Sequence, residues 1–163
     1  MNTWADAYKK KLIIPQELPA KTDELKKKGL TLATLNGSFD LLHAGHLEII
    51  YQASLFCDRL LLLLNSDSSI RKYKGCNRPI IALNERLQMA AALEFVDYLT
   101  WFDETDPRNI LSKIAPNVHV NGAEYGAECI EAETVSRLGG KIALVPRIDG
   151  LSTSNIIKRI QCV

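Results

Sequence analysis

Residues 30–46 read Leu-Thr-Leu-Ala-Thr-Leu-Asn-Gly-Ser-Phe-Asp-Leu-Leu-His-Ala-Gly-His and pass from strand-like to helical sequence. The part from 30 to 36 is short, apolar and rich in branched side chains, which is typical of a buried strand. Gly37 follows it and lets the backbone turn tightly or approach a ligand closely. From Gly45 onward the apolar residues recur at helical spacing. The segment therefore predicts a strand, a tight turn and a helix.

The same alternation continues to the end of the chain. Four later segments predict short strands: 59–65, 96–102, 117–121 and 141–146. Segments with helical spacing lie at 45–57, 84–95, 107–114, 128–138 and 152–160. Asn84 and Asp106 are the expected caps of the second and third of these helices. The pattern predicts an α/β fold, a doubly wound Rossmann-like parallel sheet of about five strands, with ligands bound beyond the carboxyl ends of the strands.

The length and composition fit one globular domain. The chain has 163 residues, of which 47% are hydrophobic and 24% charged. We expect residues 1–29 to form a peripheral N-terminal extension that contains a short polar helix at 21–28. Residues 30–163 are then the domain that carries the chemistry.

Charge and cysteine content exclude several classes of protein. The 20 basic and 19 acidic residues give a net charge of +1, so we expect neither a nucleic-acid nor a membrane partner. The longest apolar run, 60–64, is far shorter than the roughly 20 residues that span a bilayer, and the N-terminus has no apolar signal segment. The four cysteines are scattered, which favours free thiols in a reducing cytosol over a zinc site. We therefore expect a cytoplasmic protein.

Two histidines flank the glycine at which the first helix begins. His43 and His46 surround Gly45, and a helix N-terminus offers unpaired N–H groups that suit phosphate. The alternative is structural, with one imidazole capping the helix and the other filling the core. Their placement at a strand-to-helix turn favours function. A third histidine, His119, lies inside a strand pattern and is expected to be packed or hydrogen-bonded.

The segment 37–46 resembles the Gly-x-Phe-Asp-x-x-His-x-Gly-His signature of the cytidylyltransferase-like nucleotidyltransferases. A second segment, Leu-Ser-Thr-Ser-Asn-Ile-Ile at 151–157, is similar to the family's Ile-Ser-Thr-Thr-x-x-Ile motif, which opens the last helix and binds the nucleotide. The resemblance implies a nucleotidyltransferase-type fold in which the two motifs meet at one site.

Further segments are similar to the bacterial heptose-1-phosphate adenylyltransferases. They include Leu-Asn-Ser-Asp at 64–67 and the run from Arg71 to Pro79, and the similarity covers roughly 30–160. A sugar-kinase domain often accompanies this transferase, and a stand-alone form is expected here. The loop after the fourth strand departs from the family, because Asn121, Ala123 and Glu124 replace a lysine, a glycine and an aspartate.

The resemblance implies that a phosphate oxygen of the acceptor attacks the α-phosphorus of ATP and that pyrophosphate leaves. The acceptor is expected to be D-glycero-β-D-manno-heptose 1-phosphate, giving ADP-heptose for lipopolysaccharide precursor synthesis. Arg147 is similar to an arginine of the glycerol-3-phosphate cytidylyltransferases, so CTP-dependent transfer to a small phosphate stays open. A catalytically inactive nucleotide-binding subunit is the alternative from another class. Mg²⁺ is expected to arrive bound to the nucleotide, without a metal site of the protein's own, and the chain is expected to form a homodimer.

The resemblance also implies the residues of the site. The expected catalytic residues are His43, His46 and Lys74, with Lys74 in a loop that folds over the transition state. The expected nucleotide-binding residues are Gly37, Ser38, Phe39, His43, His46, Asn121, Gly122, Glu124, Arg147, Ser152, Thr153 and Ser154. The expected substrate-binding residues are Asp40, Asn65, Lys74 and Arg86. Three of these have structural alternatives: Lys74 in a solvated loop with Lys72, Arg86 paired with an acid on its own helix, and Asp40 capping its turn.

Overall fold

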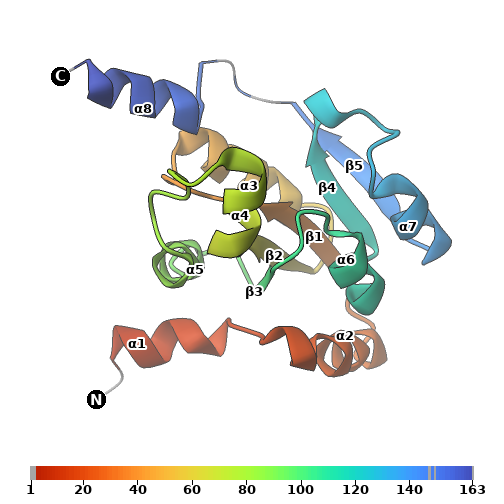
Figure 1. The fold of residues 1–163 in the computed structure, drawn as a ribbon. Helices are drawn as coiled ribbons and strands as arrows, with labels where there is room; N and C mark the ends of the chain where they lie inside the picture. The colour runs from red at the N-terminus through yellow and green to blue at the C-terminus, as the bar shows by residue number, and fades with distance from the viewer. Residues whose placement is uncertain (1–2, 147, 149, 163) are drawn as a thin grey trace.

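The computed structural model describes residues 3–146, 148 and 150–162, and its centre is a parallel sheet of five strands (Figure 1). The strands are β1 Leu32–Gly37, β2 Arg59–Asn65, β3 Tyr98–Phe102, β4 Val118–Gly122 and β5 Lys141–Val145. They lie in the order β3-β2-β1-β4-β5, and every pairing is parallel. The predicted α/β class, Rossmann-like parallel sheet and strand number are confirmed.

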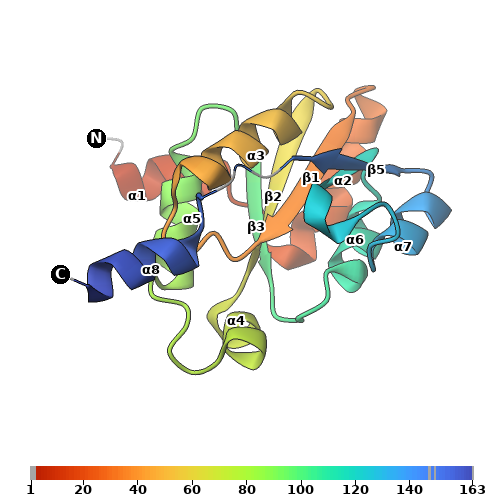
Figure 2. The ribbon, with the colours of Figure 1, turned by 90° about the horizontal axis from the view of Figure 1, so that it is seen from above.

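Helices cover both faces of the sheet, as Figure 2 shows from above. The helices are α1 Trp4–Ala7, α2 Leu18–Lys27, α3 Ala44–Ser54, α4 Asp67–Lys74, α5 Leu83–Ala91, α6 Arg108–Ile114, α7 Ala132–Arg137 and α8 Thr153–Gln161. Helices α3 and α5 pack on one face in a first apolar cluster, whereas α2, α6 and α7 pack on the other face in a second cluster. Short 3₁₀ turns lie at Tyr8–Lys10, Pro15–Glu17 and Ala123–Tyr125.

The leucine run of β2 shows why this strand lies at the centre of the molecule. Leu60, Leu62 and Leu64 belong to the first cluster, and Leu61 and Leu63 belong to the second. All five are 0–1% exposed. Alternate side chains of a strand point to opposite faces, so a strand covered on both faces needs a continuous apolar run.

Two local predictions are wrong. Asn84 does not cap α5: Ala82 is the N-cap, and the Asn84 amide oxygen accepts a hydrogen bond from the Tyr8 hydroxyl at 3.1 Å. The segment that ends at Lys74 is helix α4 and not a loop. Ser66 caps that helix, because its hydroxyl accepts from the backbone N–H of Ser69 at 3.2 Å.

The N-terminal segment is not peripheral, because it packs on the edge of the sheet. The backbone N–H of Ile13 donates to the Leu99 carbonyl, and that of Leu99 donates to the Lys11 carbonyl, both at 2.8 Å. Leu18 and Leu25 are 0% and 2% exposed in the second cluster. Residues assigned to an extension thus help to form the core on which the sheet rests.

The cysteines and the helix lengths are two further features of the structure. Each of the four cysteines is free. Within the described part of the chain, none of the helices has the length and apolar character needed to cross a membrane.

Candidate active site

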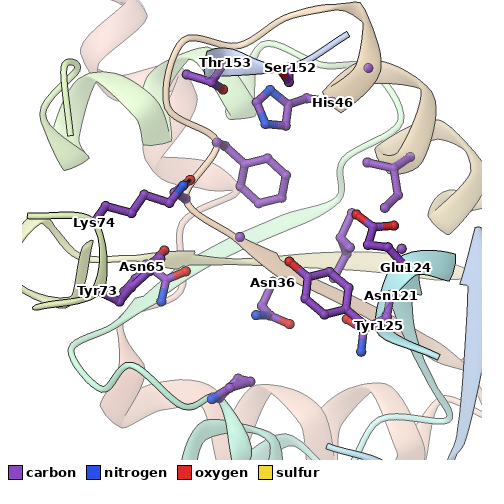
Figure 3. A pocket seen from close by; sticks show the side chains of 18 of the residues that line it. Asn36, His46, Asn65, Tyr73, Lys74, Asn121, Glu124, Tyr125, Ser152 and Thr153 are labelled. Carbon is purple, nitrogen blue, oxygen red and sulfur yellow. Dashed lines mark hydrogen bonds between the residues drawn. The ribbon is translucent and has the colours of Figure 1, made fainter. Parts of the chain in front are cut away.

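A cavity of about 710 Å³ lies beyond the carboxyl ends of β1, β2 and β4 (Figure 3). This is the edge at which parallel α/β sheets bind ligands. Most of the predicted site residues line it: Gly37, Ser38, Phe39, His43, His46, Asn65, Lys74, Asn121, Gly122, Glu124, Ser152, Thr153 and Ser154. The fold thus brings together segments that lie more than a hundred residues apart in the chain.

The loop from β1 to α3 is held in an unusual backbone conformation. Phe39 and Leu41 have φ angles of 46° and 51°, in the left-handed region that non-glycine residues seldom adopt. A Cβ atom on Gly37 would lie 3.1 Å from the Phe39 ring, a tight contact that the glycine avoids. Such strained backbone is concentrated at functional sites.

The two histidines stack on each other at the start of α3. Their ring centroids are 3.9 Å apart with 29° between the planes. His43 is the N-cap, and its Nδ1 accepts from the backbone N–H of Gly45 at 3.1 Å. The neutral ring then carries its proton on Nε2, which makes Nε2 a donor for an anion. A Cβ atom on Gly45 would come within 3.0 Å of the His43 ring, so the glycine permits this packing. His43 therefore caps the helix and lines the cavity at once.

Lys74 is the last residue of α4 and reaches the loop after β1. Its Nζ donates to the Ser38 hydroxyl at 2.9 Å. Partial desolvation, and next the nearby Arg78 guanidinium, lower the pKa of Lys74 from its ordinary value, while the Asp40 carboxylate acts in the opposite direction. The ammonium group therefore lies at the cavity, beside a neutral hydroxyl.

The N-terminus of α8 closes the cavity on the side of the histidines. Ser152 caps this helix, because its hydroxyl accepts from the backbone N–H of Asn155 at 3.2 Å. The Thr153 hydroxyl donates to the backbone carbonyl of Asp40 at 3.0 Å and ties α8 to the β1–α3 loop. Helix N–H groups and hydroxyls in this arrangement suit a phosphate.

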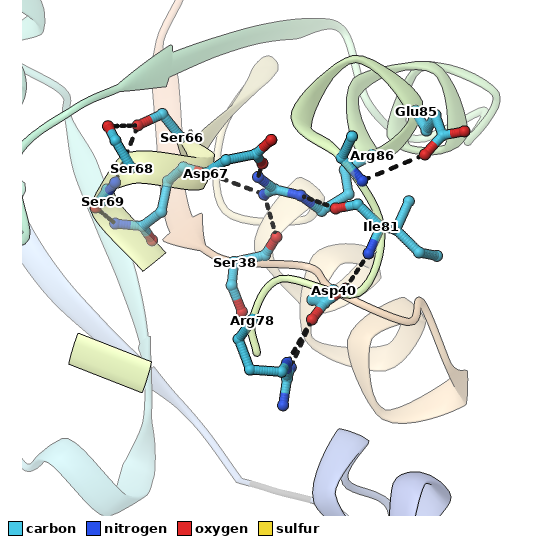
Figure 4. Close-up of polar contacts among 12 residues, drawn as sticks. Ser38, Asp40, Ser66, Asp67, Ser68, Ser69, Arg78, Ile81, Glu85 and Arg86 are labelled. Carbon is cyan, nitrogen blue, oxygen red and sulfur yellow. Dashed lines mark hydrogen bonds and ion pairs between the residues drawn. The ribbon is translucent and has the colours of Figure 1, made fainter. Parts of the chain in front are cut away.

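Asp40 does not line the cavity, and the structure does not support its prediction as a substrate-binding residue (Figure 4). Its side chain is fully buried and accepts from Arg78 Nε at 2.7 Å and from the backbone N–H groups of Ile80 and Ile81. Burial alone would raise the pKa of Asp40, but the bonds from Ile80, Ile81 and Arg78 outweigh it and lower the pKa. These bonds lead to residues 78–81 and not to the turn of Asp40 itself, so the carboxylate joins the β1–α3 loop to that segment and orients Arg78, which does line the cavity.

Arg86 is likewise outside the cavity lining and only 1% exposed, so its substrate-binding prediction is not supported (Figure 4). Its guanidinium donates to the backbone carbonyls of Ser38 at 2.6 Å and Asn65 at 2.9 Å. It also donates to the Ile81 carbonyl at 3.0 Å and pairs with Asp67 of α4 at 2.8 Å. The acid partner is thus on another helix, and Arg86 holds the ends of β1 and β2 together behind the site.

Several lining residues were not predicted: Asn36, Tyr73, Arg78, Tyr125 and Glu131. Arg78 lies in the run 71–79, and Tyr125 directly follows residues 121–124. Both segments were compared with the family, so the sequence contained a signal that these two residues belong to the site. Glu131 gave none, and it accepts from the Asn121 amide at 3.3 Å. Arg147 lies outside the described residues. His119 is buried below the cavity, 2.8 Å from the Thr34 hydroxyl, and burial lowers its pKa to about 4.

The fold and the site define an α/β domain with a cavity at the carboxyl edge of its sheet that His43, His46 and Lys74 line. Residues 34–159 match the family model described as cytidylyltransferase-like, and the chain therefore belongs to the cytidylyltransferase-like family. Membership classes it as an enzyme domain of the nucleotidyltransferase type.

Among curated proteins, the chain is similar to the bifunctional protein HldE of Syntrophotalea carbinolica, with 38% identity over 94% of this chain and 31% of the relative. The bifunctional protein HldE of Geobacter sulfurreducens is 43% identical over 83% of this chain and 28% of the relative. The chain thus spans less than a third of the length of these two relatives.

Solved structures show the same fold. A lipopolysaccharide core biosynthesis protein from Thermoplasma volcanium matches with a TM-score of 0.59 and 26% identity, over 74% of this chain and 98% of its own. Pantoate-β-alanine ligase from Francisella tularensis, complexed with beta-gamma ATP and β-alanine, matches with a TM-score of 0.61 over 92% of this chain and 77% of its own. At 16% identity, the second match supports the fold alone.

Proposed function

We propose that this domain transfers the adenylyl group of ATP to a sugar 1-phosphate and releases pyrophosphate. The observation that carries the proposal is the convergence on one cavity of three features that suit an anion. These are the stacked His43 and His46, the Lys74 ammonium against Ser38, and the capped N-terminus of α8. They come from three separate segments, and each suits phosphate oxygens.

The chemistry needs charge stabilisation and not a strong base. A phosphate oxygen of the acceptor is already ionised near neutral pH and attacks the α-phosphorus, while the bond to pyrophosphate breaks. The donors must hold two anions in line and stabilise the negative charge that develops. In this proposal Nε2 of each histidine donates to the triphosphate, and Lys74 moves onto the reacting α-phosphate from Ser38.

Mg²⁺ enters as part of the nucleotide substrate. No group of three or more His, Cys, Asp or Glu side chains among the described residues is arranged to hold a metal ion. In this proposal, triphosphate oxygens and water coordinate the ion, as they usually do for Mg²⁺.

The acceptor that we propose is D-glycero-β-D-manno-heptose 1-phosphate, with ADP-heptose as the product. The similarity to bifunctional HldE proteins and to a lipopolysaccharide core biosynthesis protein supports it. CTP-dependent transfer is the second candidate, because Asn121 stands where a lysine is usual and its amide is bonded to Glu131.

Pyrophosphate release tests these assignments. ATP and CTP are each assayed against the heptose 1-phosphate, mannose 1-phosphate and glycerol 3-phosphate. We expect release with ATP and the heptose 1-phosphate. Release with CTP alone would replace the adenylyltransferase assignment. Nucleotide binding without release in any pair would favour the inactive-subunit alternative.

We further propose a homodimer in the cytoplasm, as the family resemblance implies. Sedimentation at micromolar concentration is expected to give twice the chain mass of 18.2 kDa. A monomer under these conditions would contradict the dimer and leave the proposed reaction unaffected.

A further inference from the structure

Three asparagine side chains form a polar floor on one face of the sheet, where the strands end at the cavity. They are Asn36 of β1, Asn65 of β2 and Asn121 of β4, and all three line the cavity (Figure 3). The strand order places Asn36 between the other two. Their neighbours Leu35 and Val120 point into the first apolar cluster, so by strand alternation the asparagines face the other way.

Asn36 differs from the other two in its hydrogen bonding. The Asn65 amide donates to the Ser69 hydroxyl at 3.0 Å, and the Asn121 amide donates to Glu131. The Asn36 Oδ1 atom is buried and accepts no hydrogen bond from any described residue. Buried polar atoms without a partner are rare and costly in native proteins, and they are often found where a ligand supplies the partner.

The chemistry of this atom limits what the ligand can be. Oδ1 is an acceptor, and ionised phosphate oxygens are acceptors as well, so Oδ1 does not serve the triphosphate. A sugar hydroxyl both donates and accepts, and it therefore satisfies a buried amide. The floor also lies apart from the residues that we propose to bind phosphate. Figure 3 shows Asn36 on the opposite side of the cavity from His46 and Ser152.

We infer that Asn36 is a specificity-determining residue that accepts a hydrogen bond from a hydroxyl group of the acceptor sugar. The inference rests on the proposed function. The proposed nucleotide contacts are residues 37–39, 43, 46, 121–124 and α8, whereas Asn65, which lies next to Asn36 on the floor, is a proposed acceptor contact. Asn65 and Tyr73 line the cavity on that side and enclose a polyhydroxylated ligand with Asn36.

Steady-state kinetics of Asn36→Leu test the inference. Losing one buried hydroxyl contact is expected to lower kcat/KM for the heptose 1-phosphate about tenfold to a hundredfold, through the acceptor KM. The KM for Mg–ATP is expected to change less than about threefold. Because Oδ1 is unpaired without substrate, we expect the Tm of Asn36→Leu to equal or exceed that of the wild type. If Asn36 had a structural role, the substitution would lower the Tm. Asn109→Leu is the matched control, since Asn109 is exposed on α6 outside the cavity.

Three results would overturn the inference: an unchanged acceptor KM, an effect confined to the KM for Mg–ATP, or an equal loss in the control. If Asn36→Leu does not fold, Asn36→Ser provides the same comparison.

If the wild-type protein turns over no acceptor, the proposed function fails, and an NMR experiment tests the inference separately. The Asn36 side-chain amide signal, identified by its loss in Asn36→Ser, is then expected to shift with mannose 1-phosphate and not with inorganic phosphate. No shift, or the same shift with both, contradicts it.

Discussion

Replacing Lys74 by methionine removes the positive charge at the cavity while it keeps an unbranched side chain at the end of α4. The Lys74 Nζ donates to the neutral Ser38 hydroxyl at 2.9 Å, and no ion pair joins it to a carboxylate of the described residues. Its neighbour Arg78 is held by Asp40 at 2.7 Å. Of these two cations that line the cavity, Lys74 is therefore the better placed to move onto the reacting phosphate.

The size of the effect follows from the geometry of one charge pair. Two unit charges about 4 Å apart at an effective dielectric constant of about 20 interact by about 4 kcal/mol. This corresponds to about a thousandfold in rate, and removing one preorganised donor costs about a hundredfold to a thousandfold. We expect Lys74→Met to lower kcat by that factor and to change the KM for Mg–ATP much less.

Initial rates of pyrophosphate release at saturating Mg–ATP and acceptor measure this change. Lys72→Met is the matched control, because Lys72 lies two residues earlier on α4, is exposed and does not line the cavity. A kcat within about threefold of wild type would refute the transition-state role, since a lost preorganised donor costs far more. So would weakened nucleotide binding with unchanged turnover, or an equal loss in Lys72→Met.

The remaining predictions concern stability. Arg86→Met is expected to lower the free energy of unfolding in urea by about 3 kcal/mol, because it leaves Asp67 and three carbonyls without their donor; a loss below about 1 kcal/mol would contradict this role. His119 has its pKa lowered to about 4, so the unfolded chain takes up a proton that the folded chain excludes, and stability falls as pH drops from 6.5 toward 4. At about 1.4 kcal/mol per unit this amounts to about 3 kcal/mol. In urea unfolding at pH 6.5 and pH 4, His119→Asn is expected to lack this loss of stability. If the variant shows the same pH dependence as the wild type, burial of a neutral His119 is excluded.

The sequence predicted those elements whose signals are local. The strand–turn–helix of residues 30–46 and the bounds of β2 follow from apolar periodicity and a glycine, and the structure reproduces both. Most predicted site residues also line one cavity, because the carboxyl ends of parallel strands meet at one edge.

Long-range contacts explain why the sequence did not predict the other elements and contacts. Helix α4 buries only Ile70 among its apolar residues, so periodicity gave no signal, and it is held by the Ser66 cap and by the Ser69 hydroxyl on the Glu104 carbonyl at 2.6 Å. Arg86 finds its acid 19 residues away at Asp67. Leu99 likewise pairs with a segment that the sequence placed outside the domain.

Transfer of an α-phosphorus label tests the central claim most directly. The protein is incubated with the heptose 1-phosphate and ATP labelled at the α-phosphorus, and the products are separated. We predict that the label appears in ADP-heptose with one pyrophosphate released per product, and that His43→Ala slows this transfer at least about a hundredfold. Label that stays in ATP, or transfer at the wild-type rate in His43→Ala, would contradict nucleotidyl transfer in this cavity.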